Sequence, residues 1–159
     1  MPPFRVLVLC TGNSARSQIA EALLAARGAG RIEAASAGSR PAARVNPRAI
    51  EVLREHGIEW EERTPRSIED VTGERFDLVI TVCDDARDAC PVFEGAGARV
   101  HWGLPDPARE VEPAAARRAF RETYETLAVR VDALLALPLE RLDRAALQRL
   151  AEGVALPDR

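Results

Sequence analysis

The sequence of 159 residues contains no lysine, so all 22 basic residues are arginine and no lysine can serve in a mechanism. No apolar run approaches the length of a membrane span, and the N-terminus lacks the pattern of a signal peptide. The net charge is −3 and the basic residues form no block, which argues against a nucleic acid or an anionic membrane as partner. Only three cysteines are present, an odd number that fits a reducing cytoplasm better than a disulfide framework. We therefore expect a cytoplasmic protein.

The most informative segment is the loop that starts at Cys10. An apolar run from Phe4 predicts a buried strand that ends at this cysteine, and the pattern from Ser17 predicts a helix. Unpaired N–H groups at a helix start can surround a tetrahedral oxyanion, and an arginine such as Arg16 can hold two of its oxygens. The same positive field favours the thiolate of Cys10, which is the nucleophilic form. We predict that Cys10 is a nucleophile and that the oxyanion is bound by Thr11, Gly12, Asn13, Ser14, Ala15, Arg16 and Ser17.

The specificity of this signal comes from its context. A cysteine followed by an arginine at this spacing is by itself a weak signal of catalysis. The alternative is a buried cysteine that only packs before an ordinary turn. The combination of a strand, Cys10, a glycine at position 12 for unusual dihedral angles, Arg16, Ser17 and a helix is much more specific. It resembles the signature of the low-molecular-weight protein tyrosine phosphatase superfamily.

Strand-like and helix-like segments alternate along the chain, which predicts an α/β fold with a parallel sheet and right-handed crossovers. We expect a single low-molecular-weight phosphatase-like domain with a four-stranded sheet in the order 2-1-3-4, flanked by helices. Residues 1–138 would form this domain, and residues 139–159 a C-terminal helical extension packed on the same domain or on a partner. The expected strands are Phe4–Cys10, Ile32–Ser36, Asp77–Cys83 and Arg99–Trp102. The expected helices are Ser17–Arg27, Pro47–His56, Pro113–Leu137 and Leu139–Ala151, with Gly28 and Gly57 as stop signals.

A second cysteine, Cys83, ends the third expected strand as Cys10 ends the first. In the order 2-1-3-4 these strands are neighbours about 4.8 Å apart, and their carboxyl ends flank the point where such sheets bind ligands. A disulfide needs Cα atoms about 4.4–6.8 Å apart, so Cys10 and Cys83 can reach bonding distance with modest loop movement. Cys90 follows seven residues later in a polar segment. Two unrelated buried cysteines are the alternative, but three thiols around one loop favour a relay.

Asp106 and Pro107 follow the fourth expected strand. An Asp-Pro pair is often only a turn, but its place in another carboxyl-terminal loop puts Asp106 on the face that carries Cys10. A carboxylic acid there can protonate the oxygen that leaves phosphorus or arsenic. Phosphatases of the superfamily carry an aspartate in this late loop as general acid.

Over most of residues 4–137, the chain resembles the thioredoxin-coupled arsenate reductases of this superfamily. The matching segments are 10–14, 16–18, 36–38, 45–50, 82–85, 90–91, 101–103 and 106–107. The resemblance implies that Cys10 attacks arsenate while Asp106 helps to expel water. Cys83 then attacks the Cys10–arsenic adduct and releases arsenite, Cys90 resolves the disulfide, and thioredoxin reduces the Cys83–Cys90 pair. No cofactor and no metal site is expected, and phosphate or sulfate would compete as oxyanions.

Two other functions stay open. A tyrosine phosphatase needs only Cys10, Arg16 and Asp106, but Ala108 stands where many such phosphatases have a tyrosine that lines the substrate cleft. This departure favours an arsenate reductase with weak phosphatase side activity. The second alternative is a non-catalytic oxyanion-binding sensor in which Cys10 is only a contact.

The chain departs from the relatives at three places. Ala15 stands where some relatives have an additional cysteine, and the extension beyond Pro138 has no counterpart in the shorter relatives. Some relatives bind potassium beside the loop through an asparagine, a glutamate and a Thr-x-Asp segment. Asn13 and Glu21 match the first two, but Thr64-Pro65-Arg66 puts an arginine where the acid should be. We expect an Arg66–Glu21 contact, or at least no potassium site; an Arg66 that points to solvent is the alternative.

Overall fold

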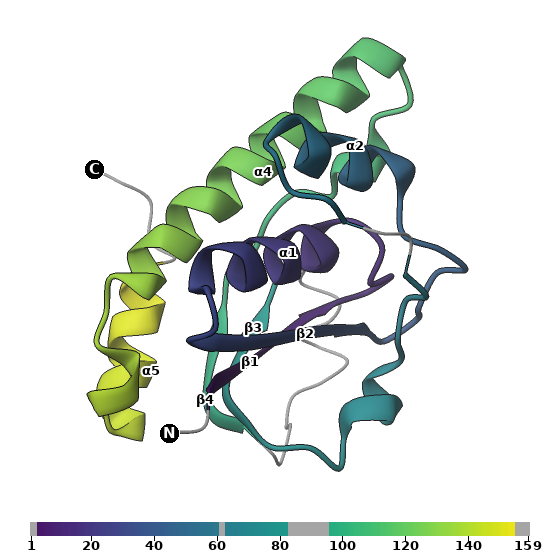
Figure 1. The fold of residues 1–159 in the computed structure, drawn as a ribbon. Coiled ribbons are helices and arrows are strands. Elements are labelled where there is room, and N and C mark those ends of the chain that lie inside the picture. Colours follow the sequence, from purple (N-terminus) through teal and green to yellow (C-terminus); the bar gives the residue numbers. More distant parts are fainter. Residues whose placement is uncertain (1–2, 61–62, 83–95, 155–159) are drawn as a thin grey trace.

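The computed structural model describes residues 3–60, 63–82 and 96–154, and its centre is a four-stranded parallel sheet (Figure 1). The strands are β1 (Phe4–Cys10), β2 (Ile32–Gly38), β3 (Phe76–Thr81) and β4 (Ala96–His101), in the order β2-β1-β3-β4. The apolar run of β1 is fully buried at positions 6–9, as suits an inner parallel strand. The expected α/β class and the strand order 2-1-3-4 are confirmed.

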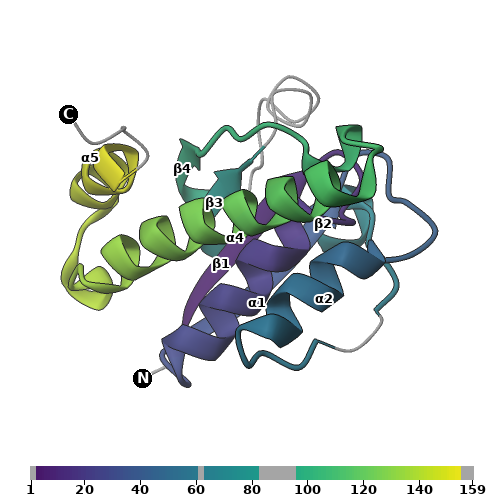
Figure 2. The ribbon, with the colours of Figure 1, turned by 90° about the horizontal axis from the view of Figure 1, so that it is seen from above.

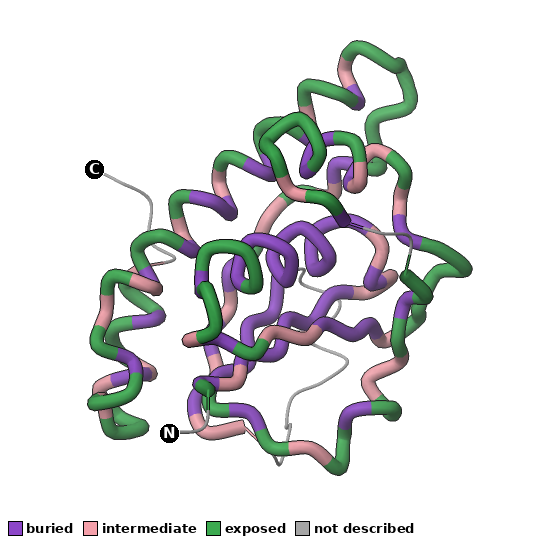
Figure 3. The backbone as a smooth tube through the Cα atoms, viewed as in Figure 1, coloured by how far each residue is buried: buried purple, intermediate pink, exposed green. Residues whose placement is uncertain are grey.

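Three helices lie side by side over one face of the sheet, as Figure 2 shows. They are α1 (Arg16–Gly28), α2 (Pro47–Glu55) and α4 (Pro113–Leu135). Short 3-10 turns cover Ile68–Val71, Pro107–Arg109 and Leu139–Arg141. The buried residues concentrate in the sheet and in α1, whereas α2 and α4 keep one exposed side (Figure 3). The apolar faces of α2 and α4 therefore pack beside α1 and close this side of the core.

Several boundaries differ from the expected ones. β3 ends at Thr81 instead of Cys83, and β4 starts at Ala96 instead of Arg99. The expected helix over 139–151 is present only from Arg144, because a 3-10 turn stands at its expected start and is followed by a separate helix, α5 (Arg144–Val154). The break has a local cause: Leu142 has an extended backbone, and the Asp143 carboxylate accepts a hydrogen bond from the Ala146 amide at 2.8 Å, which starts a new helix.

The first stop signal works differently from the expectation. Gly28 is the last residue of α1, and Ala29 takes the left-handed conformation with φ of 45°. A Cβ atom at position 28 would lie 2.7 Å from Cβ of Ile32, so the glycine is needed for close packing of α1 on β2. Gly57, with φ of 80°, follows α2 as predicted.

Candidate functional site

Cys10 ends β1 at the carboxyl edge of the sheet and is only 3% exposed. It pairs with Gly38 of β2, and residues 11–15 form the loop between β1 and α1. A Cβ atom at position 38 would lie 2.5 Å from the carbonyl oxygen of Thr11 and 2.9 Å from the amide nitrogen of Asn13. The loop is therefore pressed against the end of β2, and only glycine fits at that contact.

The carbonyl groups of the loop are turned outward onto the segment after β2. Four of them accept hydrogen bonds of 2.9 to 3.2 Å from backbone amides, in the pairs Cys10–Ser39, Thr11–Arg40, Gly12–Ala42 and Ser14–Asn46. In a trans peptide the carbonyl and the following N–H point in opposite directions. The N–H groups that follow these carbonyls therefore face the concave side of the loop, an arrangement that suits an anion.

Asn13 holds the middle of the loop in an uncommon backbone conformation. Its φ is 50°, whereas Gly12, the residue predicted to take unusual dihedral angles, has no positive φ; that expectation is wrong. The Asn13 side chain is buried, and Nδ2 donates to the hydroxyls of Ser17 at 2.9 Å and Ser36 at 2.8 Å. Its Oδ1 accepts from the Arg66 amide at 2.8 Å. Asparagine tolerates the left-handed region better than most residues, and these contacts keep it there.

A closed ring of polar contacts lies behind the loop. The Ser36 hydroxyl donates to Glu21 at 2.6 Å, and Arg63 Nη1 donates to the other oxygen of Glu21 at 2.8 Å. The Arg63 guanidinium lies 3.8 Å above the ring of Trp60, whose indole N–H donates to Gln18 at 3.0 Å. Gln18 Nε2 donates back to the Asn13 carbonyl at 3.1 Å and closes the ring. These contacts connect α1, β2 and the segment after α2 to one loop residue.

Sequence reasoning missed most of this ring as a functional unit. Gln18 and Ser36 stand inside the segments that match the relatives, so a signal for them was present. Trp60 and Arg63 carry no local pattern that points to the loop. Their role depends on how the segment after α2 folds back, which only the tertiary structure shows.

The cation beside Glu21 is Arg63, and the expectation of an Arg66–Glu21 contact is corrected accordingly. Arg66 acts on Glu21 only through longer-range attraction, while its backbone amide binds Asn13. Burial raises the pKa of Glu21 above its ordinary value, and the Ser36 hydrogen bond and the two arginines oppose this shift. A potassium ion does not fit beside the Glu21 oxygen that binds Arg63, because the guanidinium already occupies that place and carries the same charge.

Arg16, the first residue of α1, is held in one orientation by the loop after β4. Its Nη1 donates to the carbonyl of Leu104 at 2.9 Å, and Nη2 lies 3.8 Å from the Asp106 carboxylate. Its Nε is buried and has no hydrogen-bond partner within the described part of the chain. A buried N–H without a partner is costly, so this donor indicates a ligand. Nε lies on the planar fork with which arginine binds an oxyanion.

Asp106 lies at the carboxyl end of the sheet, on the same side as Arg16. One carboxylate oxygen accepts a hydrogen bond from the Ala108 amide at 3.0 Å, and the other lies toward Arg16. The side chain is one-third exposed. A carboxyl group in this position is fixed in direction and still reaches solvent.

Cys83 and Cys90 lie outside the described residues, so their predicted approach to Cys10 stays a prediction. The structure describes the chain up to Val82, whose amide donates to the Leu9 carbonyl at 3.0 Å. This bond continues the pairing of β1 with β3 next to Cys10. The backbone therefore passes beside Cys10 one residue before Cys83.

No helix among the described residues has the length and apolar character needed to cross a membrane. Within the same residues, no group of three or more histidine, cysteine or acidic side chains is placed to hold a metal ion.

The chain is similar to proteins of known family along nearly all of its length. Residues 5–149 match the model of the low molecular weight phosphotyrosine protein phosphatase family. Over 104 residues the chain is 40% identical to an arsenate reductase of Halalkalibacterium halodurans and 39% identical to one of Bacillus subtilis. Each alignment covers 65% of this chain and 74% of the relative.

Solved structures agree with the sequence comparison. An arsenate reductase in the phosphate binding state has a TM-score of 0.73 and 31% identity, covering 84% of this chain and 97% of that one. A thioredoxin-dependent arsenate reductase of Corynebacterium glutamicum has a TM-score of 0.68 and 32% identity, covering 85% of this chain and 61% of that one. A low molecular weight protein tyrosine phosphatase of T. tengcongensis has a TM-score of 0.69 and 25% identity, covering 84% and 98%. The resemblance to arsenate reductases of the phosphatase superfamily is thereby confirmed.

Proposed function

Because this chain belongs to the low-molecular-weight phosphotyrosine protein phosphatase family, we propose that its loop binds a tetrahedral oxyanion and that the protein reduces arsenate to arsenite. The observation that carries the first part is the buried Nε of Arg16, a donor without a partner among the described residues, next to outward-turned loop carbonyls. The similarity to arsenate reductases at about 40% identity supports arsenate as the substrate.

In the proposed reaction the Cys10 thiolate attacks arsenic and forms an S–As bond. The As–O bond opposite breaks, and Asp106 gives the departing oxygen a proton, so that water leaves. The positive field of Arg16 and of the loop N–H groups balances the charge of the oxyanion during this step. Arsenic is still in its +5 state at this point, because no thiol has yet been oxidised.

The redox step requires the second thiol. Cys83 attacks the sulfur of Cys10, the S–As bond breaks, and its electron pair leaves with arsenic as arsenite. The two sulfurs are oxidised to a Cys10–Cys83 disulfide. Cys90 then attacks Cys83, which frees the Cys10 thiolate, and a thioredoxin dithiol reduces the Cys83–Cys90 disulfide. We propose a reducing compartment such as the cytoplasm as the site of this cycle, because the thiols must start reduced.

The test is arsenite production with thioredoxin, thioredoxin reductase and NADPH, with phosphate as a competing oxyanion. Cys10→Ser should lose all chemistry and keep phosphate binding, because the backbone of the loop is unchanged. Cys90→Ser should complete about one turnover and trap the Cys10–Cys83 disulfide, which mass spectrometry of digests detects. Repeated turnover of Cys90→Ser with thioredoxin would show that the three-cysteine scheme is wrong.

A tyrosine phosphatase activity is the second candidate, because Cys10, Arg16 and Asp106 are sufficient for ester hydrolysis. We propose it as a weak side activity. Cys83→Ser should lose arsenate reduction and keep any hydrolysis of aryl phosphates. Hydrolysis without arsenite production in the unmodified protein would make the phosphatase the main function, and phosphate binding without either reaction would indicate a sensor.

A further inference from the structure

The helix α5 packs along the outer edge of β4, the last strand of the sheet order (Figures 1 and 2). An edge strand leaves one row of backbone N–H and C=O groups unpaired. Here the side-chain amide of Gln148 pairs with that row: its Oε1 accepts from the Arg99 amide at 2.8 Å, and its Nε2 donates to the Arg99 carbonyl. One glutamine thus takes the place of a residue of an additional strand.

A second contact ties α5 to the loop that follows β4. The Trp102 side chain is fully buried, and its indole N–H donates to the carbonyl of Ala151 in α5 at 3.4 Å. The Trp102 amide donates to Thr81 in β3 at 2.7 Å. Trp102 is therefore held between the inner sheet and α5 at the point where the loop begins.

The same loop orients the catalytic arginine of the proposed reaction. Two residues after Trp102, the Leu104 amide donates to Val82 at 3.1 Å, and the Leu104 carbonyl accepts from Arg16 Nη1 at 2.9 Å. Asp106 follows two residues later. The Trp102 contact of α5 and the contacts of Arg16 with Leu104 and Asp106 thus lie on one five-residue segment, which begins three residues after Arg99, the residue bound by Gln148.

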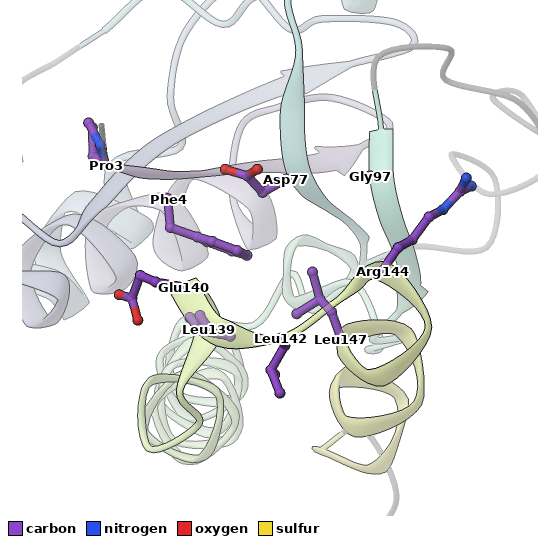
Figure 4. A pocket seen from close by; sticks show the side chains of 9 residues that line it. All are labelled: Pro3, Phe4, Asp77, Gly97, Leu139, Glu140, Leu142, Arg144 and Leu147. Carbon is purple, nitrogen blue, oxygen red and sulfur yellow. The ribbon is translucent and has the colours of Figure 1, made fainter. Parts of the chain in front are cut away.

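The first turn of α5 borders a cavity. A cavity of about 300 Å³ separates the start of the extension from the amino ends of β1, β3 and β4 (Figure 4). Its lining includes Phe4, Leu139, Leu142 and Leu147. Leu147 and Ala151 are the buried residues of α5, so the helix is attached by their packing together with the hydrogen bonds of Gln148 and Trp102.

From these contacts we infer that α5 is a positioning element for the oxyanion site, and that Gln148 is its positioning residue. It acts through β4 and Trp102 on Leu104, and Leu104 sets the direction of Arg16. The inference rests on the proposed function only in its consequence for arsenate reduction; its structural part concerns the segment 102–106. The opposing view is that α5 only shields a strand edge, which would affect stability and leave the site unchanged.

The test compares Gln148→Met with Arg149→Met. Methionine keeps the length and helix preference of glutamine and removes both hydrogen bonds to β4. Arg149 is an exposed neighbour on the same helix, so the second variant controls for an added methionine. Urea unfolding of both variants measures how much stability each loses.

Amide exchange in the full chain then reads the loop directly. Gln148→Met should speed exchange at Trp102 and Leu104 about tenfold, the equivalent of one lost hydrogen bond, and Arg149→Met should not. In a Cys10→Ser background, calorimetry should show phosphate bound about fivefold more weakly after Gln148→Met, because Arg16 loses its fixed orientation.

Unchanged exchange at Leu104 after Gln148→Met would overturn the inference, whatever happens to stability. So would faster exchange with unchanged phosphate affinity, since α5 would then hold the loop without orienting Arg16. A wild-type protein that binds phosphate but forms no arsenite would refute the proposed function. The amide exchange at Leu104 and the phosphate affinity would then still decide whether α5 positions Arg16. If it bound no phosphate, the exchange at Leu104 alone would still decide whether α5 holds the loop.

Discussion

Replacement of Asn13 tests whether its polar contacts and its strained backbone build the loop. Its side chain takes part in hydrogen bonds with Ser17, Ser36, Gln18 and the Arg66 amide, and only 1% of the residue is exposed. Asn13→Gly removes all four hydrogen bonds and allows the φ of 50°. Each buried hydrogen bond contributes about 0.5–1.5 kcal/mol, so we expect a loss of about 3 kcal/mol in the free energy of unfolding.

Asn13→Ala separates the backbone from the side chain. It removes the same hydrogen bonds as Asn13→Gly but keeps a Cβ atom at a positive φ. The strain of that Cβ atom costs more free energy than alanine gains over glycine through the lower entropy of the unfolded chain. We expect Asn13→Ala to be about 1 kcal/mol less stable than Asn13→Gly. Urea unfolding followed by circular dichroism measures both differences.

Gly12→Ala is the control in the same loop. A Cβ atom there would meet only Ser14 and Ala42, at 3.8 and 4.0 Å, which are ordinary contacts, so this variant should be as stable as the parent. Two results would refute the reasoning. Equal stability of Asn13→Ala and Asn13→Gly would mean that the positive φ is not imposed, and losses below about 1 kcal/mol in both would mean that the buried contacts do not hold the loop.

Three further predictions concern the surroundings of the loop. Because burial raises the pKa of Glu21, the folded state binds its proton more tightly, so this contribution to stability is present at low pH and is lost as pH rises through the raised pKa. Glu21→Gln should remove that fall, because glutamine does not titrate. Urea unfolding between about pH 4 and pH 8 should therefore show that the unmodified protein loses stability relative to the variant as the pH rises. Gly38→Ala should cost about 2–3 kcal/mol by the same assay, because its Cβ would overlap the Thr11 carbonyl, and full stability would contradict the close approach. Arsenite formation should proceed equally in sodium and potassium salts at equal ionic strength, because Arg63 already neutralises Glu21; a saturable rise with potassium alone would refute this.

The parts of the structure that the sequence predicts are those in which one residue pattern determines one local outcome. The continuous apolar run of β1 is typical of a buried strand, and the alternation of strands with helices predicts the parallel sheet. The loop between Cys10 and Arg16 follows from the same pattern, because a strand end and a helix start bound it.

The partners of long side chains do not follow from local pattern. Arg63 and Arg66 are three residues apart and chemically identical, and it is the tertiary contacts, Arg63 packed on Trp60 and the Arg66 amide bound to Asn13, that place Arg63 beside Glu21. The uncommon φ falls on Asn13 instead of Gly12 because buried hydrogen bonds outweigh the intrinsic preference of glycine. The contact of Gln148 with Arg99 joins residues 49 positions apart, and no periodicity in the sequence marks it.

The arginine at position 16 makes contacts in several directions that a lysine could not make at the same time. Its three nitrogens have three different surroundings: Nη1 is bound to Leu104, Nη2 lies toward Asp106, and Nε has no partner in the described chain. A planar guanidinium can serve these directions at once, whereas an ammonium is a single point of charge. Because Leu104 holds one nitrogen, the remaining edge of the fork is fixed before any anion arrives, and little side-chain entropy is left to lose on binding. The loop after β4 thus orients Arg16, the loop after β1 supplies the backbone donors, and the proposed oxyanion site depends on both.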